Sequence, residues 1–194
     1  MLDLGRYKGI IFDMDGTLID SMGSHIEAWE QTCLHYGYPF DEAYMHGLGG
    51  VPTQKTAEIL NQKFGLNHDP RDVAVYKRLV WESMDHTPTL IDETYQLFCH
   101  YRPSKQIAIG TGAERPHAEH LLQHHDLLDK LDALVTATDV THGKPHPETF
   151  VTAAQEMGLQ PSECIVFEDT EIGFQAAQSA GMDCILVRNG RIQK

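Results

Sequence analysis

The chain has 194 residues, which allows one large domain or a core domain with a smaller attachment. Its formal net charge of -13 opposes the phosphate backbone of nucleic acids, so we expect no nucleic-acid partner. No window approaches the ~20 apolar residues of a membrane span, and no apolar leader follows a basic start. We therefore expect a soluble, cytoplasmic protein with no membrane partner.

Cysteines and histidines indicate no metal site by their spacing. The four cysteines form no C-x-x-C pair, and we interpret them as buried thiols in a reducing cytosol. They are Cys33, Cys99, Cys164 and Cys184. Most of the 12 histidines are dispersed, and we interpret several as solvated side chains on helix faces. These are His100, His117, His120, His124 and His125.

The first predicted strand, residues 9–13, is followed by a long stretch without a strand signal, which lasts until past Pro88. Connections in α/β proteins usually take about 2–6 residues, so this stretch is an insertion. Its apolar residues recur at the spacing of three or four that is typical of helices. They are Ile26, Trp29, Cys33 and Tyr36, then Ala57, Leu60 and Phe64, then Val73, Tyr76, Val80 and Met84. We predict a small helical domain over residues 19–87.

Strands and helices alternate in the second half of the chain. The predicted strands span residues 106–110, 133–137, 164–169 and 184–188. The predicted helices span residues 116–128, 147–157 and 171–180. Nearly continuous Ile, Val and Leu indicate strands that are covered on both faces. The pattern predicts an α/β core domain of residues 1–18 and 88–194, with a doubly wound, mainly parallel Rossmann-like sheet.

Two pairs of carboxylates follow predicted strands. In IIFDMDGTLID, Asp13 and Asp15 are two residues apart, so on an extended chain they point to one side. Glu168 and Asp169 end another strand and reach the same edge of the sheet, where ligands of such sheets bind. Four carboxylates at one edge require a cation, and oxygen ligands of this kind suit Mg²⁺.

Groups that bind phosphate follow two further strands. Thr111 lies in IGTG, and Lys144 lies in HGKPHP. A hydroxyl and an ammonium both bind phosphoryl oxygens, while Gly110 and Gly112 allow a close approach of the backbone. Asp-x-Asp-Gly is also common in turns, and a lone Thr-Gly or Lys-Pro says little. The four features together, each after a separate apolar run, indicate a site for phosphate chemistry.

These features resemble the four motifs of the haloacid dehalogenase superfamily, and the likeness covers the whole chain. The motifs are DMDGT, Thr111 in IGTG, Lys144 in GKP, and FED. The helical insertion resembles the cap domain of that superfamily. The segments GKPHPETF and VFEDTEIGFQAAQSAGM resemble its sugar-phosphate branch, which includes β-phosphoglucomutase. Within this branch, the chain is similar to phosphatases of the fructose-1-phosphate and 6-phosphogluconate type.

The resemblance implies a mechanism. Asp13 is then the nucleophile that forms an aspartyl phosphate, and Asp15 is the general acid and later the base. Thr111 and Lys144 are implied to bind the phosphoryl oxygens. Asp13, the backbone carbonyl of Asp15, and Asp169 are implied to hold Mg²⁺. Glu168 is either a further ligand, directly or through water, or the cap of the helix that begins near Thr170.

The resemblance also implies substrate contacts in the cap. His25 resembles a histidine that positions the general acid, and Gly50 and Gly112 are implied to lie at the substrate. Lys77 either reaches into the site or is a solvated side chain. We interpret Trp29, one turn after His25, as core packing and not as a platform for the sugar.

Two departures from the mutase pattern favour hydrolysis of a small sugar phosphate. Thr53 stands where the mutases have an arginine for a second phosphate, and Ala113 stands where they have a serine. Arg115 is left open as a compensating group. The alternatives are a phosphomutase of the β-phosphoglucomutase type, a receiver-like binding module controlled by phosphorylation, and an inactive scaffold. We expect a monomer, and the sugar is not predicted.

Overall fold

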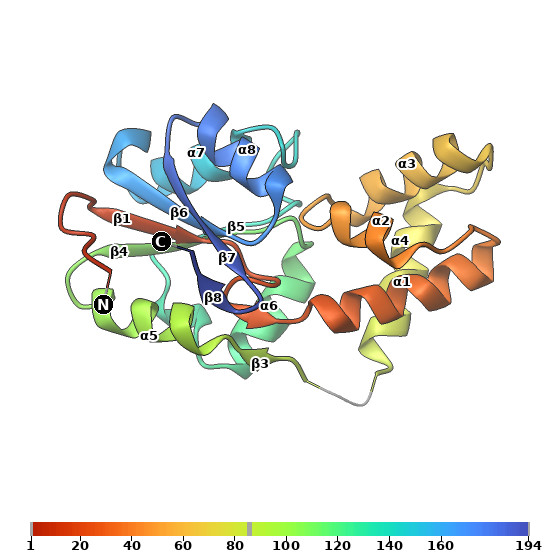
Figure 1. The fold of residues 1–194 in the computed structure, drawn as a ribbon, viewed down its shortest axis with the longest axis horizontal. Coiled ribbons are helices and arrows are strands. Elements are labelled where there is room, and N and C mark those ends of the chain that lie inside the picture. Colours follow the sequence, from red (N-terminus) through yellow and green to blue (C-terminus); the bar gives the residue numbers. More distant parts are fainter. Residues whose placement is uncertain (1, 85–86, 194) are drawn as a thin grey trace.

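The computed structural model describes residues 2–84 and 87–193. Its centre is a six-stranded sheet in the order β5-β4-β1-β6-β7-β8 (Figure 1). The strands are β1 (Gly9–Phe12), β4 (Gln106–Gly110), β5 (Ala133–Val135), β6 (Cys164–Glu168), β7 (Asp183–Arg188) and β8 (Arg191–Ile192). Parallel pairing joins β1 to both β4 and β6, and only β8 pairs antiparallel within this sheet. The predicted α/β fold class and the five predicted strands are confirmed.

The central strand β1 is apolar throughout because both of its faces are covered. Ile10 and Phe12 belong to one apolar cluster, and Ile11 belongs to a second cluster. Successive side chains of a strand point to opposite faces, so each face of the sheet has its own core. All three side chains are fully buried. This explains why the strand reads as a continuous apolar run and not as an alternating one.

Two helices cover each face of the sheet, as a doubly wound fold requires. Buried residues of α5 (Asp92–Tyr101) and α6 (Arg115–His124) join the cluster that contains Phe12. Those of α7 (Glu148–Glu156) and α8 (Glu171–Ser179) join the cluster that contains Ile11. The helix predicted over residues 116–128 ends at His124, and a separate 3₁₀ turn follows at Leu128–Lys130. A second 3₁₀ turn, Pro161–Glu163, precedes β6.

The insertion after β1 is helical, as predicted, and lies beside one end of the sheet (Figure 1). It contains α1 (Met22–Tyr36), α2 (Glu42–Gly47), α3 (Thr53–Phe64) and α4 (Pro70–Glu82). These helices have an apolar cluster of their own, which includes Trp29, Cys33, Leu60 and Val73. We call this part, α1 to α4, the cap, and the part with the large sheet the core.

The two connections between the cap and the core run side by side. β2 (Ile19–Asp20) leads into the cap, β3 (Thr89–Leu90) leads out of it, and the two strands pair antiparallel. The pair lies at the predicted domain boundaries, residues 18–19 and 87–88, which themselves stay a prediction. Residues 1, 85–86 and 194 of the predicted domains lie outside the described residues.

The interpretations of Cys99, Cys184 and His125 are wrong. Cys99 is exposed, because it lies on the outer face of α5 next to the buried Phe98, and Cys184 is only partly buried. His125 is partly buried, and its Nε2 lies 2.8 Å from the carbonyl oxygen of Pro88, so it is not a solvated side chain. Among the described residues, no helix has the length and apolar character to cross a membrane.

The stacked rings of Phe12 and Phe167 give a direct test of this core. Their centroids are 5.3 Å apart, and both side chains are fully buried. We expect Phe167→Ala to lower the free energy of unfolding by about 3–5 kcal/mol, because it leaves a cavity between the sheet and the helices that cover this face. Urea unfolding followed by circular dichroism measures the change. Leu34→Ala, at a residue that is 84% exposed, is the control and should change it by less than about 0.5 kcal/mol. If Phe167→Ala and Leu34→Ala lowered the free energy of unfolding equally, the described core would be contradicted.

Candidate active site

Asp13 lies directly after β1, at the carboxyl end of the parallel strands. Its backbone N–H donates to the carbonyl oxygen of Phe167, 2.9 Å away, and the residue is only 4% exposed. The chain then turns sharply at Gly16, whose φ is +84°. A Cβ atom on Gly16 would lie 2.3 Å from Oδ2 of Asp169, so only glycine fits. The turn thus brings the two carboxylate motifs against each other.

Asp13, Glu168 and Asp169 form one group, in which one oxygen of each carboxylate lies within 4.8 Å of the others. The ammonium of Lys144 is fully buried among them. It donates to Oδ1 of Asp13 at 2.6 Å and to Oε1 of Glu168 at 2.7 Å. The predicted nucleophile, the predicted phosphate-binding lysine and the predicted metal ligands are therefore in contact.

The charges of this group do not balance. Burial, together with the neighbouring carboxylates, raises the pKa of Asp13 to about 7 and that of Asp169 to about 9. Burial acts to lower the pKa of Lys144, but Asp13 and Glu168 outweigh burial and raise it. One ammonium thus faces three carboxyl groups in a buried space, and burial, reinforced by the neighbouring carboxylates, raises the pKa values of Asp13 and Asp169. An all-oxygen group with excess negative charge fits a hard divalent cation.

Glu168 does not cap the following helix by itself. Its Oε2 accepts hydrogen bonds from the backbone N–H of Thr170 at 2.7 Å and from the Thr170 hydroxyl at 2.8 Å. The Thr170 hydroxyl oxygen in turn accepts from the N–H of Gly173 at 3.0 Å, which makes Thr170 the N-cap of α8. Glu168 therefore uses one carboxylate oxygen for Lys144 and the other for Thr170.

Thr111 and Gly112 lie where the cap meets the core. Thr111 is 1% exposed, and its hydroxyl oxygen accepts a hydrogen bond from the N–H of Ala113. A Cβ atom on Gly112 would lie 2.2 Å from the carbonyl oxygen of Gly50. Glycine at position 112 therefore allows the cap loop around Gly50 to rest against the loop that follows β4.

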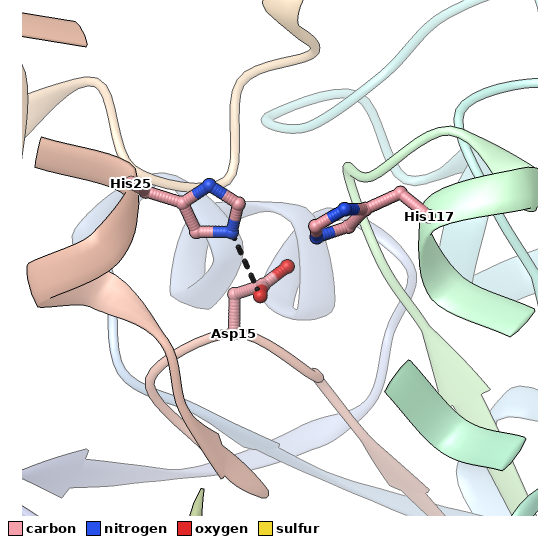
Figure 2. A group of neighbouring side chains, drawn as sticks. All are labelled: Asp15, His25 and His117. Carbon is pink, nitrogen blue, oxygen red and sulfur yellow. Dashed lines mark hydrogen bonds and ion pairs between the residues drawn. The ribbon is translucent and has the colours of Figure 1, made fainter. Parts of the chain in front are cut away.

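Asp15 is held by residues from the start of the cap (Figure 2). Ser21 donates its hydroxyl to Asp15, and Nε2 of His25 lies 2.9 Å from the same carboxylate. On the other side of the ring, Nζ of Lys77 lies 2.6 Å from Nδ1 of His25. When the lysine ammonium donates to Nδ1, the proton of a neutral imidazole is on Nε2 and points at Asp15. Lys77 is therefore linked to Asp15 through His25 and is no solvated side chain.

Burial and neighbouring groups shift the pKa values of Asp15, His25 and Lys77. Burial acts to raise the pKa of Asp15, but His25 and the Ser21 hydroxyl outweigh burial and hold it below its usual range. Burial and the Lys77 ammonium lower the pKa of His25, and burial lowers the pKa of Lys77 to about 8. Asp15 is thus an ionised carboxylate in this arrangement.

His117, which we interpreted as a solvated side chain, lies at the site. Figure 2 shows its ring facing Asp15 from the side opposite His25. The ring packs edge-on against Trp81, with centroids 4.3 Å apart, and burial lowers the pKa of His117 to about 3. The position was detectable in principle, because His117 lies in the first turn of the helix that begins just after Thr111 and Gly112.

A cavity of about 100 Å³ lies between the cap and the core. Nearly all predicted substrate residues line it: Asp13, Asp15, His25, Gly50, Lys77, Thr111 and Gly112. Lys144 is not part of this lining, but its ammonium contacts the carboxylate of Asp13, which is. Trp29 belongs to the apolar cluster of the cap and also lines the cavity.

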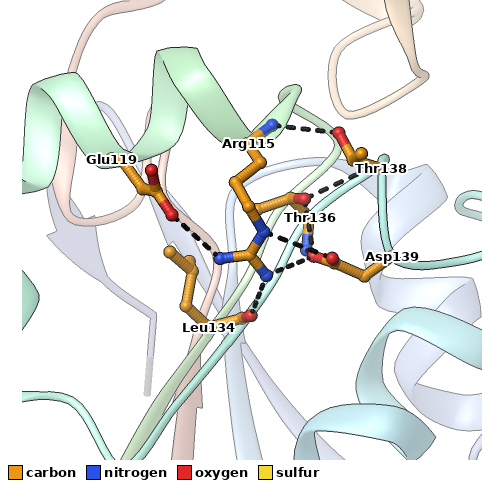
Figure 3. A network of polar contacts seen from close by, with 6 residues as sticks. All are labelled: Arg115, Glu119, Leu134, Thr136, Thr138 and Asp139. Carbon is orange, nitrogen blue, oxygen red and sulfur yellow. Dashed lines mark hydrogen bonds and ion pairs between the residues drawn. The ribbon is translucent and has the colours of Figure 1, made fainter.

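Arg115 is engaged elsewhere (Figure 3). Its guanidinium donates twice to Asp139, at 2.6 and 3.2 Å, and once to Glu119 at 3.2 Å. It also donates to the carbonyl oxygen of Leu134 at 2.9 Å. All its guanidinium nitrogens therefore have partners that hold the start of α6 to the loop after β5. The structure gives Arg115 no role as a compensating phosphate ligand.

Known proteins are similar to this chain in both sequence and fold. A family model described as haloacid dehalogenase-like hydrolase matches residues 10–187. The fructose-1-phosphate phosphatase YqaB of Escherichia coli (strain K12) is 39% identical, over 94% of this chain and 97% of that protein. The validoxylamine A 7'-phosphate phosphatase of Streptomyces hygroscopicus subsp. limoneus is 35% identical, over 92% and 84%.

A solved structure is similar to this chain in fold. The β-phosphoglucomutase of Clostridium difficile has a TM-score of 0.81 at 25% identity, over 94% of this chain and 85% of that one. The match of the family model covers the whole cap and most of the large sheet, without β8. This chain therefore belongs to the haloacid dehalogenase-like hydrolase family.

Proposed function

We propose that this protein is a Mg²⁺-dependent phosphatase that hydrolyses small sugar phosphates through an aspartyl-phosphate intermediate. The observation that carries the proposal is the contact of Asp13 with Lys144 at one end of the cavity, beside an Asp15 that the cap holds through His25. The phosphatase names of the two relatives support the same reaction for this chain.

In the first step, an oxygen of Asp13 attacks phosphorus, and the bond between phosphorus and the ester oxygen breaks. Thr111 binds the phosphoryl oxygens, and Lys144 offsets the charge that gathers at Asp13. Asp15 gives a proton to the leaving sugar oxygen. Asp15 is ionised without substrate, so its acid role depends on the incoming phosphate, whose negative charge raises its pKa and lets it take up a proton.

In the second step, the aspartyl phosphate is hydrolysed. Asp15, again a carboxylate, takes a proton from water, and the water oxygen attacks phosphorus. Phosphate leaves, and Asp13 returns as a free carboxylate. The hydrogen bonds from Ser21 and His25 favour the ionised form of Asp15, which is the form that this step needs. Closure of the cap over the cavity keeps bulk water from the first step.

Mg²⁺ fits beside Asp13 and Asp169, with the backbone carbonyl of Asp15 as a third protein ligand. Glu168 accepts hydrogen bonds from Lys144 and Thr170 and would contribute to the site as a further ligand, directly or through water. When bound, the ion supplies positive charge that offsets the carboxylates and the substrate phosphate. The fit rests on the oxygen donors and their excess negative charge.

Hydrolysis is favoured over a phosphomutase reaction. A mutase needs a grip on a second phosphate, and the arginine expected for it in the cap is replaced by Thr53, which lines the cavity. The guanidinium of Arg115 is occupied by Asp139 and Glu119. A cytoplasmic monomer without a nucleic-acid partner stays a prediction.

The proposed nucleophile gives the main test. We expect the purified protein to release phosphate from fructose 1-phosphate, 6-phosphogluconate or β-glucose 1-phosphate in the presence of Mg²⁺, and EDTA to stop the release. Asp13→Asn should lower the rate roughly 1000-fold or more, because it removes the attacking carboxylate. Asp129→Asn, the same change on the surface, is the control. Conversion of β-glucose 1-phosphate to glucose 6-phosphate without free phosphate would show a mutase instead.

The raised pKa values of Asp13 and Asp169 predict how stability depends on pH. A carboxyl with a raised pKa in the folded state stabilises the fold at low pH, and this contribution is lost as pH rises through the folded pKa. With EDTA present, we expect Tm to fall between about pH 4 and pH 9, the range that ends at the value of about 9 for Asp169. Mg²⁺ or Asp169→Asn should reduce this fall, whereas Asp129→Asn should leave it. A fall in Tm that is reduced neither by Mg²⁺ nor by Asp169→Asn would contradict a cation site at these carboxyl groups.

Arg115 gives a test of its structural role. We expect Arg115→Ala to lower the free energy of unfolding by about 1 kcal/mol, because it removes the contacts with Asp139 and Glu119. KM for sugar phosphates should change less than about twofold, since surface changes outside a site have small effects. Arg71→Ala, an exposed arginine of α4, is the matched control in both measurements. A KM that rises on the order of tenfold in Arg115→Ala alone would assign the arginine to phosphate binding.

A further inference from the structure

Two polar ring atoms at the cavity are buried without a hydrogen-bond partner. They are Nε1 of Trp81 and Nε2 of His117, and neither has a partner among the residues that the structure describes. Both side chains line the cavity. Their rings meet edge to face, with centroids 4.3 Å apart. A buried polar atom without a partner is costly, and the great majority in proteins are paired.

The two rings come from different parts of the molecule. Trp81 lies in the cap helix α4, and His117 lies in the core helix α6. The pair therefore forms only when the cap is closed on the core. His117 is next to Asp15, because one ligand atom each of Asp15, His25 and His117 lie within 4.8 Å of one another (Figure 2). His117 thus lies beside the carboxylate that we assign to the leaving group, and Trp81 packs against His117.

A metal ion does not explain this pair. The indole N–H of Trp81 is a donor only and binds no cation. Nε2 of His25 already faces Asp15, and the Lys77 ammonium lies on the other nitrogen of the same ring, so a second cation would meet a positive charge. A neutral ligand with hydroxyl groups fits better, because a hydroxyl accepts from an N–H and also donates to a ring nitrogen.

We propose that Trp81 and His117 recognise a hydroxyl group of the leaving sugar, on the carbon next to the phosphoester carbon. The inference rests on the proposed function and adds a specificity determinant to it. Asp15 meets the ester oxygen, and a hydroxyl on the neighbouring carbon lies close enough to reach a ring at the side of Asp15. The substrate then supplies the partners that the closed site lacks, so closure is favoured when a polyol phosphate is present.

The test compares three phosphates in the wild type, Trp81→Phe and His117→Ala. The first is the preferred sugar phosphate, the second its analogue without the neighbouring hydroxyl, and the third acetyl phosphate. Trp81→Phe keeps an aromatic ring and removes the N–H. Both variants should lower kcat/KM for the sugar phosphate roughly 5- to 20-fold, the effect of one lost hydrogen bond. The other two phosphates should change much less.

Control variants separate recognition from damage to the site. His120→Ala, an exposed histidine one turn further along α6, should leave all three rates unchanged. His117→Gln places an amide near the position of Nε2 and should restore part of the loss. An equal loss on all three phosphates would show that His117 acts on Asp15 and would overturn the inference. No loss on the sugar phosphate would overturn it as well.

Calorimetry with Asp13→Asn distinguishes this inference from the proposed function. In that background, His117→Ala should weaken binding of the sugar phosphate and leave binding of its deoxy analogue and of inorganic phosphate unchanged. If the wild type hydrolysed acetyl phosphate but no sugar phosphate, the proposed substrate class would be refuted. The binding comparison would still test whether Trp81 and His117 recognise the hydroxyl group. Equal binding of the sugar phosphate and its deoxy analogue would overturn the inference.

Discussion

The buried ammonium of Lys144 joins the first and last motifs of the chain. It contacts Asp13 at the end of β1 and Glu168 at the end of β6, two neighbouring parallel strands. A charge in such a place is tolerated only with opposite charges and hydrogen bonds around it. The third carboxyl group, Asp169, has no ammonium partner among the described residues, and burial raises its pKa to about 9, so a bound cation would favour its ionised form. The chemistry proposed for the site follows from this imbalance.

The protonation state of Asp15 also depends on residues of the cap. Asp15 belongs to the core, yet the residues that hold it in the ionised form, Ser21 and His25, lie at the start of the cap. Lys77 of α4 in turn contacts His25. Movement of the cap therefore changes the surroundings of the proposed acid and base directly. Gly112 allows this closure, since any side chain there would meet the cap loop. In the proposed function, closure of the cap on the substrate would therefore also set the surroundings of Asp15.

Local pattern predicted the positions of several site residues after buried strands, and the structure places them near one edge of the sheet, while their catalytic and binding roles stay predictions. Asp13, Thr111 and Lys144 follow apolar strands, and parallel strands bring their carboxyl ends to one edge. The errors concern residues whose environment depends on distant segments. His117 reads as an exposed residue on a helix until Trp81 of the cap covers it. The role of Arg115, which the sequence left open, also depends on a distant segment, because Asp139 binds its guanidinium.

The sequence alone determined the alternation of strands and helices, the helical insertion and the motif positions, because these depend on periodicity and on short-range order along the chain. The tertiary structure decided which side chains meet across the cap and the core, including the link from Lys77 to Asp15 and the unpaired rings of Trp81 and His117. Such contacts join helices far apart in the chain, and their geometry is set by packing. Local sequence patterns therefore do not predict these contacts.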